Sequence, residues 1–261
     1  MRMCYPSAIL VKVCDHKLGM KSGFLFLVFA LLAFNPGRAE TVLWDDFSDE
    51  EIMTPTETAT GAIWLVTSGK FAADGSDIGN FKPMAGELNF GVDKDTAIVI
   101  DYGPIVEDSA TTLKLDIRQS NESNAFHRLD IVLTDKEDGG AFVLGCSPSS
   151  EFFGTSGFAL FDNQNNLLVS GLGGSALRSD TNLQNIELQI DPLRGMTVMQ
   201  DGMTILEWKN DGSTHFTPDR LSMKTPIPGV SWFVKNVEVD SKVDQEKLKK
   251  ISSKNYERNI R

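Results

Sequence analysis

The feature that most constrains this chain is the length and period of its apolar runs between residues 41 and 240. The runs are short, rich in β-branched and aromatic residues, and separated by Gly, Asp, Asn and Ser. At residues 113–118 (LKLDIR) apolar and charged side chains alternate, so a strand there has one buried and one wet face. No stretch of this region keeps the 3.6-residue period of an amphipathic helix. The pattern predicts an all-β body.

Thirteen strands are predicted from these runs. They cover residues 42–47, 63–67, 87–92, 97–102, 112–118, 128–134, 141–146, 157–161, 167–170, 186–190, 197–200, 204–208 and 230–239. Asp201-Gly202 is a dipeptide that favours a tight hairpin, because both residues tolerate positive φ. So many short strands without a helix favour two packed antiparallel sheets in one domain.

Residues 1–39 have the pattern of a secretory signal peptide. An apolar run at 23–34 follows Met20, itself a candidate true start, and a small-x-small pattern ends at Ala39. The run is shorter than the roughly 20 residues that a membrane span needs, although a buried core helix is an alternative interpretation. We therefore expect a secreted or periplasmic protein, cleaved near Ala39 and without a membrane span.

Charge and cysteine content exclude several classes of protein. Residues 40–241 hold 13 Lys and Arg against 32 Asp and Glu, a net charge of −19, which repels nucleic acid and anionic membrane surfaces. The tail at 242–261 is basic and poor in apolar residues, so we expect it to be helical or disordered. A mature chain would keep only Cys146, which excludes a disulfide-stapled scaffold.

Four motifs occur in a characteristic order. They are LWDDFSD at 43–49, WLVTSGKF at 64–71, a strand-Asp-Gly-strand hairpin at 200–202, and WFVKNVEV at 232–239. With them the chain resembles the concanavalin A-like lectin/glucanase superfamily, including laminin-G-like sandwiches, as a divergent secreted bacterial-type member. The resemblance implies a two-sheet antiparallel jelly-roll sandwich over residues 40–241. Lectins, binding modules, glycosidases, lyases and adhesion domains all share this fold, so it does not fix the function.

Catalytic motifs of these families are missing from the sequence. The Glu-x-Asp-x-x-Glu pattern of the β-glucanases has only a partial match at Glu238-Val239-Asp240, which lacks the second Glu. No nucleophile elbow and no paired histidines occur. The sequence therefore favours a non-catalytic protein. A divergent glycoside hydrolase or polysaccharide lyase stays open, with His127 as a candidate base.

Carbohydrate binding requires exposed rings with polar groups beside them. The candidate rings are Trp208, Phe152 and Phe153, and the candidate amides are Asn163 and Asn165. We expect the remaining tryptophans to be core residues: Trp44, Trp64 and Trp232. The leading hypothesis is a secreted, non-catalytic sandwich that binds an extracellular glycan. The alternative is an adhesion or structural domain whose partner is a surface protein.

Calcium is the ion that this sequence suits best. Carboxylates on loops match a hard cation, and we expect a structural Ca²⁺ held by Asp45, Asp46 and Asp240. The acidic loop at 135–138 is a further candidate. No other cofactor is expected.

Overall fold

The computed structural model describes residues 39–49, 51–72, 86–90, 96–120, 127–178, 182–212, 215–227 and 229–259. Residues 39–261 form a compact unit of their own. The predicted signal peptide, up to residue 38, lies outside the described residues. Within the described ranges, no helix has the length and hydrophobicity to cross a membrane.

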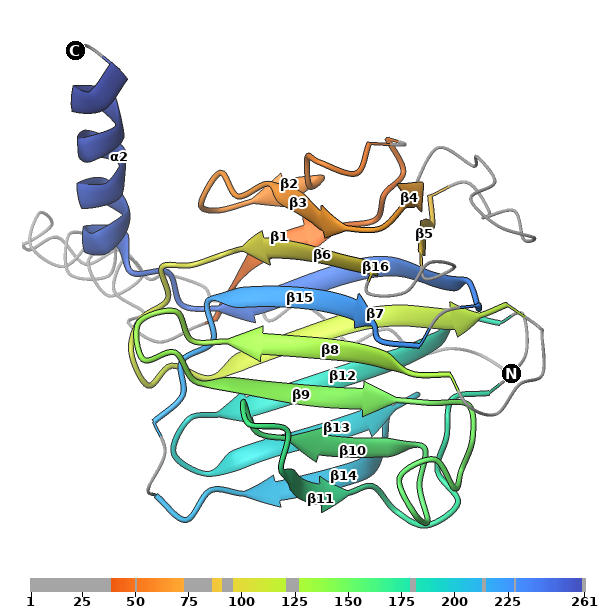
Figure 1. The fold of residues 1–261 in the computed structure, drawn as a ribbon. Coiled ribbons are helices and arrows are strands. Elements are labelled where there is room, and N and C mark those ends of the chain that lie inside the picture. Colours follow the sequence, from red (N-terminus) through yellow and green to blue (C-terminus); the bar gives the residue numbers. More distant parts are fainter. Residues whose placement is uncertain are drawn as a thin grey trace, which may run out of the picture. The chain divides into compact units, whose positions relative to one another are not determined.

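One layer of the fold is a nine-stranded antiparallel sheet, here called sheet A. Its main path is β14 (Met203–Lys209), β13 (Gly195–Gln200), β12 (Gln184–Asp191), β7 (Thr111–Gln119), β16 (Trp232–Ser241), β1 (Glu40–Asp45) and β2 (Glu57–Thr58). Off this path, β5 (Leu88–Phe90) pairs with β16, and β4 (Phe71–Ala72) pairs with β5. The first and last strands of the sandwich are therefore neighbours (Figure 1).

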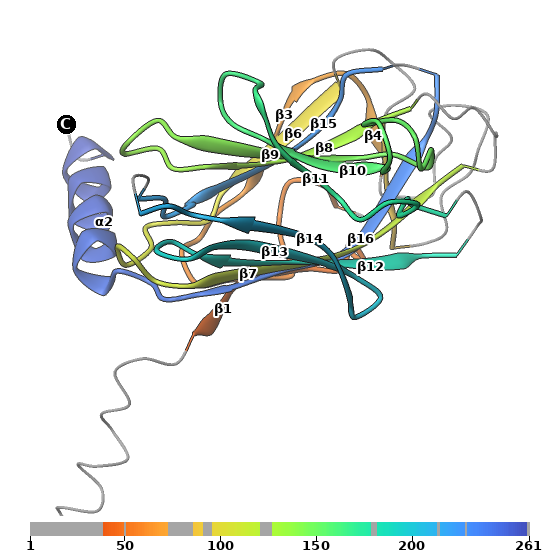
Figure 2. The ribbon, with the colours of Figure 1, turned by 90° about the horizontal axis from the view of Figure 1, so that it is seen from below.

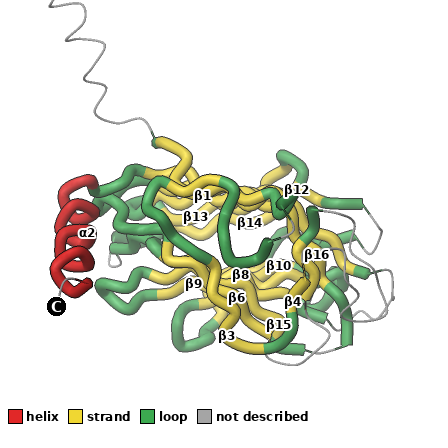
Figure 3. The backbone as a smooth tube through the Cα atoms, turned by 90° about the horizontal axis from the view of Figure 1, so that it is seen from above, coloured by secondary structure: helices red, strands yellow, loops and turns green. Residues whose placement is uncertain are grey.

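The second layer, sheet B, has seven antiparallel strands. Their order is β11 (Leu167–Ser170), β10 (Phe158–Phe161), β9 (Ala141–Cys146), β8 (Leu129–Thr134), β15 (Arg220–Thr225), β6 (Thr96–Asp101) and β3 (Trp64–Ser68). Figure 2 shows the two sheets edge-on as separate layers, and Figure 3 shows α2 (Gln245–Asn259) at one end of them. The predicted two-sheet antiparallel sandwich is confirmed.

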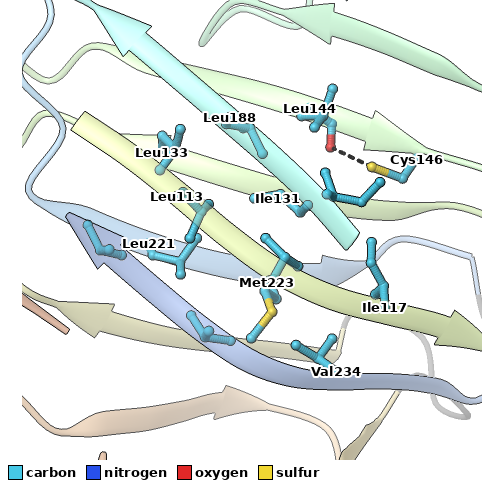
Figure 4. Close-up of a cluster of buried hydrophobic side chains, with 14 of the residues drawn as sticks. Leu113, Ile117, Ile131, Leu133, Leu144, Cys146, Leu188, Leu221, Met223 and Val234 are labelled. Atoms are coloured by element: carbon cyan, nitrogen blue, oxygen red, sulfur yellow. Dashed lines mark hydrogen bonds between the residues drawn. The ribbon is translucent and has the colours of Figure 1, made fainter. Parts of the chain in front are cut away.

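The core fills the space between the two sheets. Leu113 and Ile117 of β7 point towards sheet B, where Ile131, Leu133 and Met223 point back at them (Figure 4). All five are at most 1% exposed. The alternation seen in the sequence is thus the alternation between this core and the two outer faces.

All thirteen predicted strands are present, with ends shifted by two residues or fewer, and the described residues contain three more. The additional strands are β2, β4 and β15. β15 lies in the middle of sheet B, where Leu221 and Met223 point inward and Lys224 is exposed. With only two large apolar residues, this run is too weakly hydrophobic to mark a strand from sequence.

The tail begins as a docked helix. Asp244 caps it, because its Oδ1 accepts the backbone N–H groups of Glu246 (3.1 Å) and Lys247 (3.0 Å). Leu248 packs against the core cluster, and Lys247 Nζ lies 2.7 Å from Glu137 Oε2 in the β8–β9 turn. The predicted charged tail therefore starts as an ordered part of the sandwich.

Two of the three tryptophans predicted as core residues are in the core. Trp64 and Trp232 are 0% exposed. The prediction was wrong for Trp44, which is half-buried and pairs with Glu57 and Glu238 on the outer face of sheet A. Its neighbour Leu43 takes the inward position, so alternation turns Trp44 outward.

Candidate functional site

The register of sheet B determines which side chains reach its outer face. Ile131 of β8 points into the core, so Asp130 points outward. Asp130 is paired with Gly145 on β9 and with Lys224 on β15. Three adjacent strands therefore place these positions in one row across the face that Figure 1 looks onto.

The centre of this outer face is covered by other side chains. Asp130 and Phe161 are 8% exposed, and Val132 and Ser222 are 7% exposed, although all four point away from the core. Lys224 beside them is exposed. Neighbouring side chains therefore enclose a strip of the face.

Two phenylalanines come to this strip from the loop between β9 and β10. The Phe153 ring lies over Gly145, where a Cβ atom would be 2.6 Å from the Phe153 Cζ. Its centroid is 5.5 Å from that of Phe161, and Phe152 meets Phe153 edge-on at 4.7 Å. Gly145 leaves room for an aromatic ring to rest directly on the sheet. The predicted ring residues Phe152 and Phe153 thus lie together, both half-buried.

An ion pair lies against the rings. The Arg128 Nε donates a hydrogen bond to Asp130 Oδ1. The guanidinium lies 4.7 Å from the Phe161 ring centroid and 5.3 Å from that of Phe153, within the range of cation–π attraction. Burial raises the pKa of Asp130, and the charges of Arg128 and Lys224 oppose that rise. The result is a pair of opposite charges held in fixed positions against two aromatic rings.

His127 is next to this cluster in the sequence. It is half-buried, and burial lowers the pKa of its imidazole, which favours the neutral form at pH 7. Its Nδ1 has no hydrogen-bond partner among the described residues. A neutral imidazole can donate or accept a hydrogen bond, but this Nδ1 is buried away from solvent.

The other predicted ligand-binding residues lie at the rim or elsewhere. Asn163 and Asn165 are exposed in the β10–β11 turn, which begins directly after Phe161. Trp208 is on β14 of sheet A, with its ring 4.9 Å from that of the core residue Phe142. The structure therefore gathers the phenylalanines, leaves the amides at the edge of the face, and places Trp208 in the other sheet.

Arg128, Asp130, Phe161 and Lys224 were not identified from sequence. The available signal was a carboxylate, Asp130, between two large apolar residues, Leu129 and Ile131. The alternation predicted only a solvent-exposed side chain at this position. What distinguishes Asp130 is its burial on an outward face. That burial depends on a loop about 20 residues further along the chain, which no strand pattern reveals.

Two of the residues predicted to bind calcium are adjacent and already hydrogen-bonded. Asp45 accepts the Trp64 Nε1–H (2.7 Å) and the Phe47 N–H (2.9 Å), and burial raises its pKa to about 6. Asp46 accepts the Ser48 N–H at 3.0 Å, and its hydrogen bonds with Ser48 lower its pKa. The Asp45 carboxylate thus connects β1 of sheet A to Trp64 of sheet B.

The third predicted calcium ligand lies apart from them. Asp240 is opposite Thr41 in the β1–β16 ladder, four residues and thus about 13 Å along β1 from Asp45. It is bound by Lys114 at 3.3 Å and by the Thr41 hydroxyl at 2.8 Å. The three carboxylates therefore do not fit one ion. In the described ranges no three His, Cys, Asp or Glu side chains are grouped to hold a metal, so structural calcium stays a prediction.

Solved structures of the same fold exist at low sequence identity. A protein of unknown function with a galectin-like fold from Bacillus subtilis has a TM-score of 0.51 at 11% identity, covering 78% of this chain and 98% of its own. The cellulose induced protein Cip1 has a TM-score of 0.50 at 10% identity, covering 76% and 96%. The binding domain of botulinum neurotoxin DC in complex with SialylT has a TM-score of 0.51 at 12% identity, covering 81% and 50%.

These likenesses establish the fold alone, a two-sheet antiparallel jelly-roll sandwich similar to the galectin-like fold of the Bacillus subtilis protein. No protein-family model matches the chain, and no curated protein matches it in sequence.

Proposed function

We propose that the outer face of sheet B binds carbohydrate. The observation that carries the proposal is the Arg128–Asp130 pair, held against the Phe153 and Phe161 rings on an outward face of the sandwich. A sugar presents an apolar C–H face, which packs on a ring, and hydroxyls, which bond to charged groups fixed in orientation. Both kinds of group occur here within one strip.

The charge of the body narrows the ligand class. Residues 40–241 carry a net charge of −19, which disfavours polyanionic glycans at long range. Locally, Arg128 and Lys224 face one buried carboxylate, Asp130, so the strip itself is not strongly acidic. A neutral glycan fits both conditions.

We infer further that the protein is secreted and non-catalytic. Secretion is supported by the signal-peptide pattern at residues 1–39. The lack of a second glutamate after Glu238-Val239-Asp240 supports a binding role over glycoside hydrolysis. Structural calcium, whose predicted ligands Asp45, Asp46 and Asp240 do not share one site, remains a prediction that the experiment below tests.

A glycan array tests this proposal directly. Residues 39–261 would be applied with calcium and again with chelator, beside the variants Phe153→Leu and Asp130→Asn. We expect specific binding that falls at least tenfold in both variants, about the effect of one lost hot-spot contact. Phe71→Leu is the matched control, because Phe71 is half-buried in sheet A against Phe90.

Three outcomes would overturn parts of the proposal. A blank array in both conditions would leave the adhesion or structural role as the better hypothesis. Cleavage of an arrayed glycan would identify a divergent hydrolase or lyase, with His127 the first residue to substitute. Equal binding by Phe153→Leu and the unsubstituted protein would place the glycan site on another face. Loss of binding in chelator alone would support the calcium prediction.

A further inference from the structure

A cavity lies on the opposite side of the sandwich from this strip. A cavity of about 430 Å³ opens on the outer face of sheet A, where β7, β12, β13 and β14 are neighbours. Its walls are the β12–β13 turn at residues 191–195 and the ends of β7 and β14. A volume of this size falls within the range of about 300–1,000 Å³ that is typical of small-molecule pockets.

The floor of the cavity is one polar row across four strands. Thr112 pairs with Gln189, Gln189 with Thr197, and Thr197 with Glu207. Their neighbours along each strand point into the core, so these four side chains point outward. Adjacent strands lie about 4.8 Å apart, so the row offers a hydroxyl, an amide, a hydroxyl and a carboxylate at regular intervals.

Most of these groups are available to a ligand. The hydroxyls of Thr112 and Thr197 and the carboxylate of Glu207 make no hydrogen bond to a side chain or backbone group in the described part of the chain. The Gln189 Nε2 donates to Glu187 Oε1 at 2.8 Å, which orients the amide and leaves its oxygen as an acceptor. Donors and acceptors therefore alternate along the floor.

The charges around the cavity balance, although the body is strongly acidic. Asp191 and Glu207 line it together with Arg194 and Lys209. Asp191 Oδ1 accepts the N–H groups of Leu193 and Arg194, which fixes the turn, and Asp191 Oδ2 lies 3.6 Å from the Arg194 Nε. A locally neutral cavity lined with hydroxyl, amide and carboxylate groups favours an uncharged ligand with many hydroxyls.

We propose that this cavity is a second binding site, which takes a neutral mono- or disaccharide unit. The site shares no residue and no sheet with the strip on sheet B, and its ligand class is argued from its own lining. Two sites that face away from each other cannot bind one short glycan together. Each site would therefore bind a different glycan chain. A bivalent protein of this kind gains avidity on a polysaccharide surface.

An NMR titration tests the second site. Cellobiose, maltose, lactose and N,N′-diacetylchitobiose would each be added to ¹⁵N-labelled residues 39–261. We expect at least one disaccharide to shift the backbone amides of Thr112, Thr197 and Glu207 together. Thr197→Val and Glu207→Gln should each weaken that binding about tenfold, the effect of one lost hydrogen bond.

The control variant is Thr204→Val, because Thr204 is exposed on β14 outside the cavity lining and should leave the titration unchanged. The Phe153→Leu variant should retain the same shifts, so failure at sheet B is distinguished from failure at sheet A. The proposal is overturned if none of the four sugars shifts these amides, or if the shifts survive both Thr197→Val and Glu207→Gln with the spectrum otherwise native.

Discussion

The two outer faces of this sandwich obey the same alternation and have opposite character. On sheet B, one row of paired outward positions is mainly apolar: Val99, Ser222, Val132, Val143 and Phe161. On sheet A, a corresponding row is entirely polar: Thr41, Asp240, Thr112, Gln189, Thr197 and Glu207. The comparison shows that outward position and solvation are separate properties, because Ser222 and Val132, at the centre of the sheet B row, point outward and are only 7% exposed.

Each face also carries an arginine–carboxylate pair stacked on a phenylalanine. On sheet A, Arg118 lies 3.8 Å from the Phe233 ring centroid and bonds to Glu87 through two nitrogens, at 2.9 and 2.6 Å. On sheet B, Arg128 donates a hydrogen bond to Asp130, and its guanidinium lies 4.7 Å from the Phe161 ring centroid. The side chains of Arg118 and Glu87 are 7% and 1% exposed, against 16% and 12% for Arg128 and Asp130. The sheet A pair is therefore the more deeply desolvated of the two.

The largest predicted effect comes from breaking these two pairs. Glu87→Ala leaves the Arg118 charge buried without its partner, so we expect the free energy of unfolding to fall by about 3–5 kcal/mol. Asp130→Ala should cost less, because Arg128 is nearer to water. Urea denaturation of both variants measures the difference. A smaller loss for Glu87→Ala than for Asp130→Ala would contradict the order of burial described here.

The connection between the sheets should depend on pH. Asp45 accepts the Trp64 indole N–H and has a pKa of about 6, raised by burial from 3.8. Between these two pH values the native state binds more protons than the unfolded state, so stability falls as pH rises. The stabilisation that Asp45 provides in its protonated form is present below about pH 4 and is lost above about pH 6. It amounts to at most about 3 kcal/mol of unfolding free energy.

Asp45→Asn tests this assignment. Thermal unfolding from pH 4 to pH 7 should show a decline in stability for the unsubstituted protein that is smaller in the variant. The difference between the two proteins isolates Asp45 from other groups with raised pKa values, such as Asp219. Parallel pH profiles for both proteins would show that Asp45 does not titrate in this range.

A smaller effect is expected from filling the space above Gly145. A Cβ atom there would lie 2.6 Å from Phe153 Cζ and 3.2 Å from Arg128 Nε, so Gly145→Ala must displace the ring from the sheet. We expect a loss of about 1–2 kcal/mol in unfolding free energy, typical of overpacking, and loss of glycan binding at sheet B. Gly173→Ala is the control, because its nearest neighbour would be 3.9 Å away. Unchanged glycan binding by Gly145→Ala would show that the ring position is not needed.

The contrast between the faces also explains what the sequence could predict. Residues 113–118 alternate apolar and charged side chains, so β7 and its place in a sandwich were evident from the pattern alone. On β10, the outward residues Ala159 and Phe161 are as apolar as the inward ones, so FALF indicates a strand but not which face carries the site. Phe153 could be named from its loop, whereas Asp130 could not, because its burial depends on contacts between separate segments. Trp44 was misassigned because composition alone does not show which face of β1 is covered.

The smallest effect should come from the exposed charges on sheet A. Lys114 lies 3.3 Å from both Glu238 and Asp240, and all three side chains are between 24% and 35% exposed. Lys114→Met should change the unfolding free energy by no more than about 1 kcal/mol, because water already solvates these charges. Lys114 and Arg118 lie on the same face of β7, four residues apart, and only Arg118 is in the buried pair. Urea denaturation at low and high salt would measure both pairs. If Lys114→Met lowered the free energy of unfolding as much as Glu87→Ala, burial would not explain the difference between the two ion pairs on this face.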